Sequence, residues 1–426
     1  MFALLKQIFN PRHKDVRKRI LFVFAVFFVF KLGTTIIVPG IDKELLTGNL
    51  GFLELINTMG GGAMERFSIF SLGVMPYISA SIIIQLLTLD FVPYFSELKK
   101  QGQVGRMKLN KISRYLGIML AFTQGYMFSF TYLADVEPLA HVQIALVLTA
   151  GTAFLLWLGD QITLKGFGNG ISMIIMAGIV ASLPTMFTTA WSSLSDFTTS
   201  QTGALGITKF VLFILLYIAL IIGIVFEENA ERRIPIQYAN KSVDGRTKQS
   251  YIPVKLNPSG VIPVIFASVL VSIPSIIEQF VRNDSITLFV NKWLAMNTLT
   301  GFIIYVLLIL GSTYLYTLNV QLKPKDVEEN IKNSGGFIPG VRLGDETVNY
   351  ISKTLKRTTF VGAVILAVIA GLPTVFSAVS NMPTSVTIGG TGIIIVVGVL
   401  METYRQLESE LLSNSGVKRV KKRGRR

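Results

Sequence analysis

Two stretches of this chain have nearly the same sequence: GVMPYISASI at Gly73–Ile82 and GVIPVIFASV at Gly260–Val269. Gly, Val, Pro, Ile, Ala and Ser recur at six of the ten positions, at an offset of 187 residues. The alternative is coincidence between two apolar helices of similar composition, which six identities that include a proline disfavour. The match predicts an internal repeat that divides the chain into two related halves.

The composition places this repeat in a membrane. The chain has 426 residues, of which 51% are hydrophobic and 15% are charged, and its mean hydropathy is +0.56. Soluble domains have roughly a quarter charged residues. Disordered and nucleic-acid-coating proteins combine their charge with low hydrophobicity. The apolar excess must therefore face something other than water.

The chain offers little for catalysis or metal binding. It has no Cys, which excludes disulfides, Fe–S clusters and thiolate zinc sites, and its two His, His13 and His141, lie far apart. No nucleophile–base pair, paired carboxylates or phosphate-binding P-loop stands out in the sequence. We predict that the protein is not an enzyme and uses no metal and no cofactor.

Ten apolar segments of about 20 residues predict ten membrane-spanning helices. They are 20–38, 72–90, 115–133, 142–159, 171–189, 208–226, 260–280, 299–320, 358–378 and 388–407. The predicted fold class is an all-α integral membrane protein. Ten crossings return the chain to its starting side. Because successive spans alternate in direction, the second and seventh spans run in opposite directions. The repeat thus predicts two inverted-topology halves of five spans around a central pathway.

The basic residues decide the orientation. The net charge is +15, from 40 Lys and Arg against 25 Asp and Glu. By these spans, 34 of the 40 lie on the side of the termini, four on the other side and two in or beside spans. The positive-inside rule then places both termini and the long loops in the cytoplasm. The predicted divisions are listed here: N-terminus 1–19, first half 20–190, second half 191–410 and basic tail 411–426.

The segment at about 50–70 fits neither a span nor a loop. It is too short and too polar to cross, too apolar for a free loop, and interrupted by Gly60, Gly61 and Gly62. One interpretation is a re-entrant element, which is tolerated at membrane depth only inside protein or a wet cavity. The other is an amphipathic helix on the outer leaflet. The residues alone leave both open.

Two long basic loops, 227–259 and 321–357, have signs of local structure. The first alternates apolar residues around Asp244 and Gly245, which predicts a β-hairpin. The second contains a short helical stretch and a Gly/Pro-rich turn around Arg342. Their length favours a docking surface for a large partner over topology signals alone. The tail from Lys418 either binds anionic lipid or RNA phosphates non-specifically or serves only as a topology signal.

Six motifs, in order along the ten predicted spans, resemble the SecY family of protein translocase channels in its bacterial form. They are GVMPYISASIIIQLL (73–87), WLGDQITLKGFGNGIS (157–172), ERRIPIQYA (231–239), PVKLNPSGVIPVIFAS (253–268), NIKNSGGFIPGVRLG (330–344) and IGGTGIIIVVG (388–398). The resemblance runs from about residue 17 to residue 408.

This resemblance implies a pore between the two halves, closed at its waist by an apolar ring. The matching ring positions are Val74, Ile78, Ile171, Ile175, Ile265 and Ile395. Such a ring excludes water and ions by dewetting and offers no strong site to a passing chain. The resemblance also implies that segment 50–70 is a re-entrant plug helix, with Leu55, Ile56, Gly60, Gly61, Met64 and Phe67 as plug residues.

The resemblance further implies a lateral gate and a docking surface. The gate would be lined by Ser79, Gln85, Ser268 and Ser272, and the docking charges would be Arg246, Lys248 and Arg342. Where the family commonly has Pro, this chain has Leu343. The implied partners are the small subunits SecE and SecG, the SecA motor ATPase or the ribosome, secretory preproteins or signal peptides, and membrane lipid.

The function implied by the resemblance is a channel in the bacterial cytoplasmic membrane. It would conduct unfolded secretory polypeptides across and release signal or transmembrane helices sideways into lipid. The alternative from the residues is a secondary transporter with a five-plus-five inverted repeat. A transporter needs polar groups near the midplane, and the spans offer little beyond Gln85 and Lys31. A scaffold without a pathway would not require the repeat.

Overall fold

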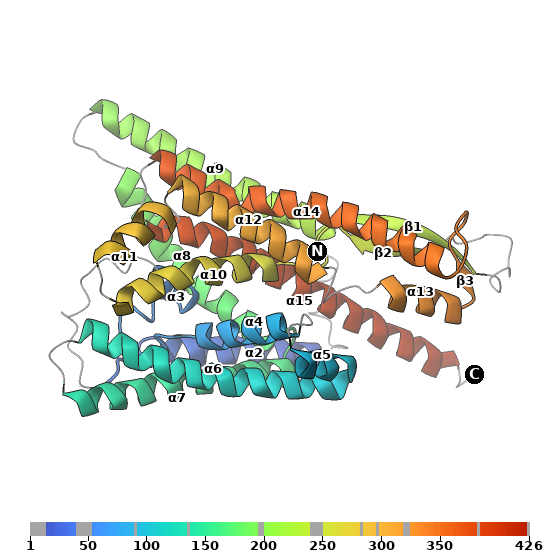
Figure 1. Cartoon of the computed structure of the whole chain (residues 1–426), viewed down its shortest axis with the longest axis horizontal. Coiled ribbons are helices and arrows are strands. Elements are labelled where there is room, and N and C mark those ends of the chain that lie inside the picture. Colours follow the sequence, from blue (N-terminus) through green and yellow to red (C-terminus); the bar gives the residue numbers. More distant parts are fainter. Residues whose placement is uncertain are drawn as a thin grey trace. The chain divides into compact units, whose positions relative to one another are not determined.

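The computed structural model describes residues 14–39, 53–88, 92–133, 137–194, 200–238, 250–281, 284–294, 298–317, 324–380 and 384–423. These residues are mostly helical (Figure 1). The chain forms two compact units. The first contains Met1–Gly203, Gln279–Arg282 and Met382–Arg426, and the second contains Ala204–Glu278 and Asn283–Asn381. These units are defined by which residues pack together, whereas the predicted halves 20–190 and 191–410 are defined by the direction of the spans. The two halves therefore stay a prediction.

The first unit consists of helices. They are α2 (Lys14–Gly33), α3 (Leu53–Met59), α4 (Met75–Leu87), α5 (Pro93–Lys100), α6 (Gln103–Tyr132), α7 (Pro138–Lys165), α8 (Gly170–Leu194) and α15 (Thr384–Arg423). α6 and α7 lie side by side as a long hairpin (Figure 1). α4 packs against α6, and α8 packs against both α7 and α15. The last helix of the chain is therefore part of the same unit as the first ones.

Proline and glycine shape these helices. Pro76 lies in the first turn of α4, where its missing N–H would have no helical partner. A Cβ built at Gly117 of α6 would lie 3.0 Å from the Cα of Tyr77 on α4. Helices in lipid gain little from hydrophobic burial against each other, so contacts of this kind let them associate by close packing.

The segment between α2 and α4 is tied to the unit by backbone pairing and aromatic stacking. Ile37 and Ser68 form an antiparallel bridge. The ring of Phe70 stacks on Phe30 of α2 and on Phe154 of α7, with centroid distances of 6.2 and 6.0 Å. Phe70 thus fixes the chain before α4 to both α2 and α7.

The second unit combines helices with a small sheet. Its helices are α9 (Ser200–Asn229), most of α10 (Ile262–Val281), α11 (Asp284–Phe289), the π-helix η3 (Val290–Leu294), α12 (Leu299–Tyr316), α13 (Pro324–Asn333) and α14 (Asp345–Ser380). α12 packs against α14. Ser312 of α12 also donates a 3.2 Å hydrogen bond to the carbonyl oxygen of Pro263 on α10.

The two long polar loops fold together into one loop module, which comprises 231–238, 250–255 and 324–355. Strand β1 (Glu231–Tyr238) pairs antiparallel with β2 (Ser250–Lys255) and with β3 (Gly336–Phe337), in the order β2-β1-β3. The core of the module is listed here: Ile234, Ile236, Val254, Ile331, Ile338, Ile351 and Leu355. The two strands of the predicted hairpin are confirmed, whereas its turn at Asp244 and Gly245 lies outside the described residues. The sequence pattern gives no sign of β3 or of the shared core.

Five helices of the described part are long and apolar enough to cross a membrane. They are Pro138–Lys165, Gly170–Leu194, Gly206–Asn229, Leu299–Tyr316 and Asp345–Ser380. Two shorter apolar helices, Met75–Leu87 and Ile262–Pro274, lie within the predicted second and seventh spans. The predicted spans 20–38, 115–133 and 388–407 fall on α2, α6 and α15. The all-α membrane class is confirmed apart from the small sheet, and the count of ten crossings stays a prediction.

We predict that Gly151→Ala destabilises the protein. A Cβ at Gly151 of α7 would overlap the carbonyl oxygen of Ile69, so the helix and the segment before α4 must separate. The free energy of unfolding should fall by about 1–3 kcal/mol, measured as a lower midpoint of thermal unfolding in detergent. Gly311→Ala is the control, because no atom lies within 4 Å of a Cβ built there. An equal loss in both variants would contradict the prediction.

Candidate functional site

Residues 56–74 are mostly buried inside the first unit, apart from the exposed Glu65 and Arg66. Met64 and Phe67 are fully buried, and Ile56 is 7% exposed. A surface amphipathic helix would leave one face in water, whereas this segment buries polar residues such as Asn57 and Ser68 together with its apolar ones. The structure therefore favours a re-entrant element over a helix on the outer leaflet. Leu55, another predicted plug residue, belongs to α3.

Asn57 organises the turn that follows α3. Its side-chain oxygen accepts hydrogen bonds from the backbone N–H groups of Met64 and Glu65, both at 3.2 Å. Its carbonyl oxygen accepts a 2.9 Å bond from Gly62. Gly61 and Gly62 have φ values of 72° and 79°, which glycine adopts at no steric cost. The Gly run thus reverses the chain, and Asn57 satisfies backbone groups that have no helical partner.

The segment packs against α8 and α15. A Cβ at Gly178 of α8 would overlap the carbonyl oxygen of Met59, and a Cβ at Gly61 would lie 3.3 Å from the Cα of Gly178. A Cβ at Gly73, just before α4, would lie 3.9 Å from the Cα of Gly60. The predicted plug therefore contacts α8 one turn beyond Ile175 and the chain directly before Val74.

Two predicted ring positions lie at the start of α4. The N–H of Ile78 donates a 3.1 Å hydrogen bond to the carbonyl oxygen of Val74, so both belong to one helical turn. Both side chains are buried. Thr152 of α7 donates a 3.1 Å bond to the carbonyl oxygen of Gly73, which fixes the start of α4 to the hairpin.

Three further ring positions lie on helices that pack against each other. Ile175 of α8 and Ile395 of α15 are 3% and 2% exposed, while Ile171 is half-buried. A Cβ at Gly159 of α7 would lie 3.0 Å from Cγ1 of Ile171. Five of the six ring positions thus belong to three helices of the first unit. The sixth, Ile265, is a half-buried residue of α10 in the second unit.

The predicted gate residues lie on α4 and α10. Ser79 and Gln85 are half-buried, and the amide of Gln85 donates a weak 3.4 Å bond to the hydroxyl of Ser81. The hydroxyl groups of Ser268 and Ser272 donate to the carbonyl oxygens of Val264 and Val269 in their own helix. These two buried serines thus donate to backbone groups of their own helix.

Known proteins are similar in sequence to this chain over nearly its whole length. The sequence model of the SecY family matches residues 68–404. The protein translocase subunit SecY of Staphylococcus epidermidis is 42% identical over 429 residues, which cover 96% of this chain and 97% of that protein. This chain belongs to the SecY family.

Two solved structures share the fold. One, described as a protein conducting channel, has a TM-score of 0.68 at 18% identity and 93% coverage of both chains. The other has a TM-score of 0.63, also at 18% identity and 93% coverage of both chains. It is described in terms of the SecY plug domain, which stabilises the closed state of that translocation channel and maintains a membrane seal. At this identity, the two structures show a common fold alone.

The predicted ring and plug positions share one chemical character. The predicted ring and most of the predicted plug side chains are apolar. Within the described ranges, no three His, Cys, Asp or Glu side chains come close enough to hold a metal ion. In channels, an apolar constriction excludes water and ions, which is the role predicted for these positions.

One docking residue inferred from the SecY family, Arg342, is exposed on an anchored turn between β3 and α14. The hydroxyl of Thr347 donates a 2.7 Å hydrogen bond to the carbonyl oxygen of Arg342. The N–H of Gly344 donates a 3.1 Å bond to Oε1 of Glu328, a buried residue of α13. The turn is thus held at Arg342 itself and at Gly344, two residues later. The other two docking residues, Arg246 and Lys248, lie outside the described residues.

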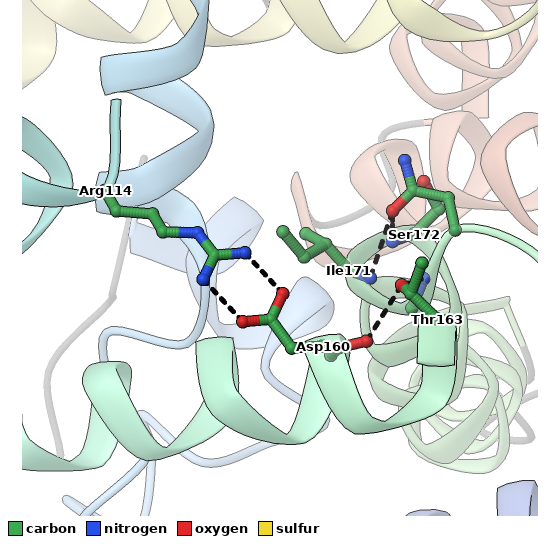
Figure 2. Close-up of polar contacts among 8 residues, drawn as sticks. Arg114, Asp160, Thr163, Ile171 and Ser172 are labelled. Atoms are coloured by element: carbon green, nitrogen blue, oxygen red, sulfur yellow. Dashed lines mark hydrogen bonds and ion pairs between the residues drawn. The ribbon is translucent and has the colours of Figure 1, made fainter. Parts of the chain in front are cut away.

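Sequence reasoning missed the charged pair beside the ring. Arg114 of α6 and Asp160 of α7 form a two-fold ion pair (Figure 2). Both lie at the ends of predicted spans on the side of the termini, and antiparallel pairing of these spans brings such ends together. Asn57 was the other missed residue, because it lies inside α3 and the residues that its side chain contacts follow only after the Gly run.

We predict that Asn57→Ala loosens the turn after α3. The backbone N–H groups of Met64 and Glu65 would lose their acceptor in a buried site, at a cost of about 1–3 kcal/mol. Amide hydrogen exchange at residues 60–68 should accelerate roughly tenfold, measured by mass spectrometry in detergent. Asn110→Ala, at an exposed position of α6, should leave this exchange unchanged. Unchanged exchange in Asn57→Ala would remove Asn57 from this role.

Proposed function

We propose that this chain forms a protein-conducting channel that translocates unfolded secretory polypeptides across the bacterial cytoplasmic membrane. It would also release signal sequences and transmembrane helices sideways into lipid. The observation that supports this most directly is the buried plug segment, packed against the helices that carry Ile175 and Ile395 and joined to the start of α4. Membership of the SecY family supports the same function.

The proposed mechanism depends on an apolar constriction. Val74, Ile78, Ile171, Ile175 and Ile395, with Ile265 of the second unit, form the ring that closes around a passing chain. Branched apolar side chains make no strong bonds to polypeptides of arbitrary sequence, and a narrow apolar pore dewets and blocks ions. The plug fills the pathway when no substrate is present. Its single short helix and glycine-containing turn allow it to leave as a unit.

Sideways release follows from ordinary hydrophobic transfer. A signal sequence gains about 25 cal/mol for each Å² of apolar surface that moves from water to lipid. The proposed gate lies where α4 and α10 present Ser79, Gln85, Ser268 and Ser272. The secondary transporter is not favoured, because the ring positions offer no polar groups to bind a small solute.

The proposed partners follow the family. We propose that SecE and SecG accompany the chain, that secretory preproteins or signal peptides are its substrates, and that the SecA motor, the ribosome or both dock on the loop module. The exposed Arg342 on its anchored turn supports docking there. Both termini would then be cytoplasmic, in agreement with 34 of 40 basic residues on that side.

The pore ring is tested by Ile78→Ser. A polar side chain at the constriction should hold water, so ion leak through the reconstituted closed channel should rise about tenfold. Export of proteins with defective signal sequences should rise with it. Ile83→Ser on the same helix is the control, since Ile83 is 41% exposed whereas Ile78 is 9% exposed. Wild-type leak and sorting in Ile78→Ser would refute the ring.

The docking role is tested by Arg342→Glu. Reversing this charge should reduce preprotein export at least about tenfold, because like charges across an interface cost several times the thermal energy. Amounts of inserted protein should stay normal, since the Arg342 side chain is exposed and the anchoring bonds use other groups. Lys353→Glu, at an exposed position of α14 in the same module, controls for charge alone. Undiminished export in Arg342→Glu would remove the docking role.

A further inference from the structure

The Arg114–Asp160 ion pair joins the two helices of the α6–α7 hairpin. Both guanidinium nitrogens Nη1 and Nη2 donate to the two carboxylate oxygens (Figure 2). The side chains are 41% and 28% exposed, so water reaches the pair. A two-fold Arg–carboxylate bond fixes relative orientation as well as distance, whereas a partly exposed pair contributes little to global stability. The pair is therefore suited to setting geometry more than to holding the fold together.

On the α6 side, the pair lies next to the start of α4. Gly117 is three residues from Arg114 and thus on nearly the same face of α6. A Cβ at Gly117 would lie 3.0 Å from Cα and 3.3 Å from Cβ of Tyr77. Tyr77 lies close enough to Arg114 and Asp160 for both charges to act on its hydroxyl group. Tyr77 directly precedes the ring residue Ile78, so the position of α6 sets the position of that part of the ring.

On the α7 side, the pair lies next to the start of α8. Asp160 follows Gly159, whose missing side chain leaves room for Cγ1 of Ile171. The hydroxyl of Thr163 donates a 3.0 Å hydrogen bond to the carbonyl oxygen of Gly159 and accepts a 2.9 Å bond from the N–H of Gly170 (Figure 2). α8 therefore begins in a fixed relation to the turn of α7 that carries Asp160.

We propose that the Arg114–Asp160 ion pair is a positioning element for the apolar ring. It holds α6 and α7 together at the level where α6 supports Tyr77 and Ile78 and where α7 supports Ile171. Loss of the pair lets the hairpin separate locally, which moves two ring-bearing helices apart without unfolding the unit. This inference rests on the proposed function, because it assumes that the ring seals a channel.

The test measures ion leak of the purified full-length complex in planar lipid bilayers. Asp160→Asn and Arg114→Gln each remove one charge while keeping a similar side-chain size. Each should raise closed-channel leak roughly threefold, the size expected for a partly exposed ion pair. The exchanged pair, Arg114→Asp with Asp160→Arg, should return the leak at least halfway to the wild-type value. A purely structural role would instead lower the amount and thermal stability of the complex in the two single variants.

Two further variants make the outcomes distinct. Glu410→Gln removes the ion pair of Arg19 with Glu410, which joins α2 and α15 with similar exposure. Glu410 lies 15 residues, or about 22 Å along the helix, beyond Ile395, so leak should not change. Ile78→Ser is the positive control for the ring.

The results separate this inference from the proposed function. If Ile78→Ser leaks while Asp160→Asn and Arg114→Gln do not, the ion pair does not position the ring and the channel function stands. If Ile78→Ser does not leak either, the ring itself is refuted. An exchanged pair that leaks as much as the single variants, in folded complex of normal amount, overturns the positioning role. Leak in both single variants and its recovery in the exchanged pair support it.

Discussion

Backbone polar groups inside a membrane protein must find partners within the protein, and this constraint shapes the segment between α3 and α4. A helix meets it by itself, but the chain between Met59 and Val74 is not helical. Several of its N–H groups donate hydrogen bonds to acceptors nearby. These acceptors are the side-chain oxygen of Asn57, the carbonyl oxygen of Ala63, and the carbonyl oxygen of Ile36 on the chain after α2. Only because these partners exist can an irregular segment lie buried among helices. The predicted plug, and its contacts to the helices that carry the predicted ring positions, depend on these hydrogen bonds.

The packing of the helices also requires that backbones approach one another closely, and glycine residues make this possible. Gly178 admits the carbonyl of Met59, and Gly159 admits Ile171. In a lipid environment, such contacts provide van der Waals packing where hydrophobic force between helices is absent. The segment before α4 combines these glycine contacts with the stacking of Phe70 on Phe30 and Phe154.

Much of the fold could be predicted from the sequence, because its strongest signals are local or repeated. Apolar runs predict helices, and the Gly73 and Gly260 repeats predict paired halves. Alternation around Asp244 predicts the β1–β2 pairing. What escaped prediction joins residues far apart in the chain. Strand β3 is only two residues long, and the Arg114–Asp160 pair requires the register of the α6–α7 hairpin. Individual ring residues follow from family resemblance, because apolar periodicity alone cannot distinguish pore-facing from lipid-facing isoleucines.

The loop module has a consequence for how this surface evolves. β1 comes from one long loop and β3 from another, yet they share a sheet and one core with α13 and α14. A substitution at Ile236 therefore has to fit Ile338 and Ile351, which lie more than 100 residues away in sequence. Residues of the two loops therefore have to change together in evolution. Exchanging one of the loops between relatives would disturb the shared core, whereas exchanging both together would carry it over intact.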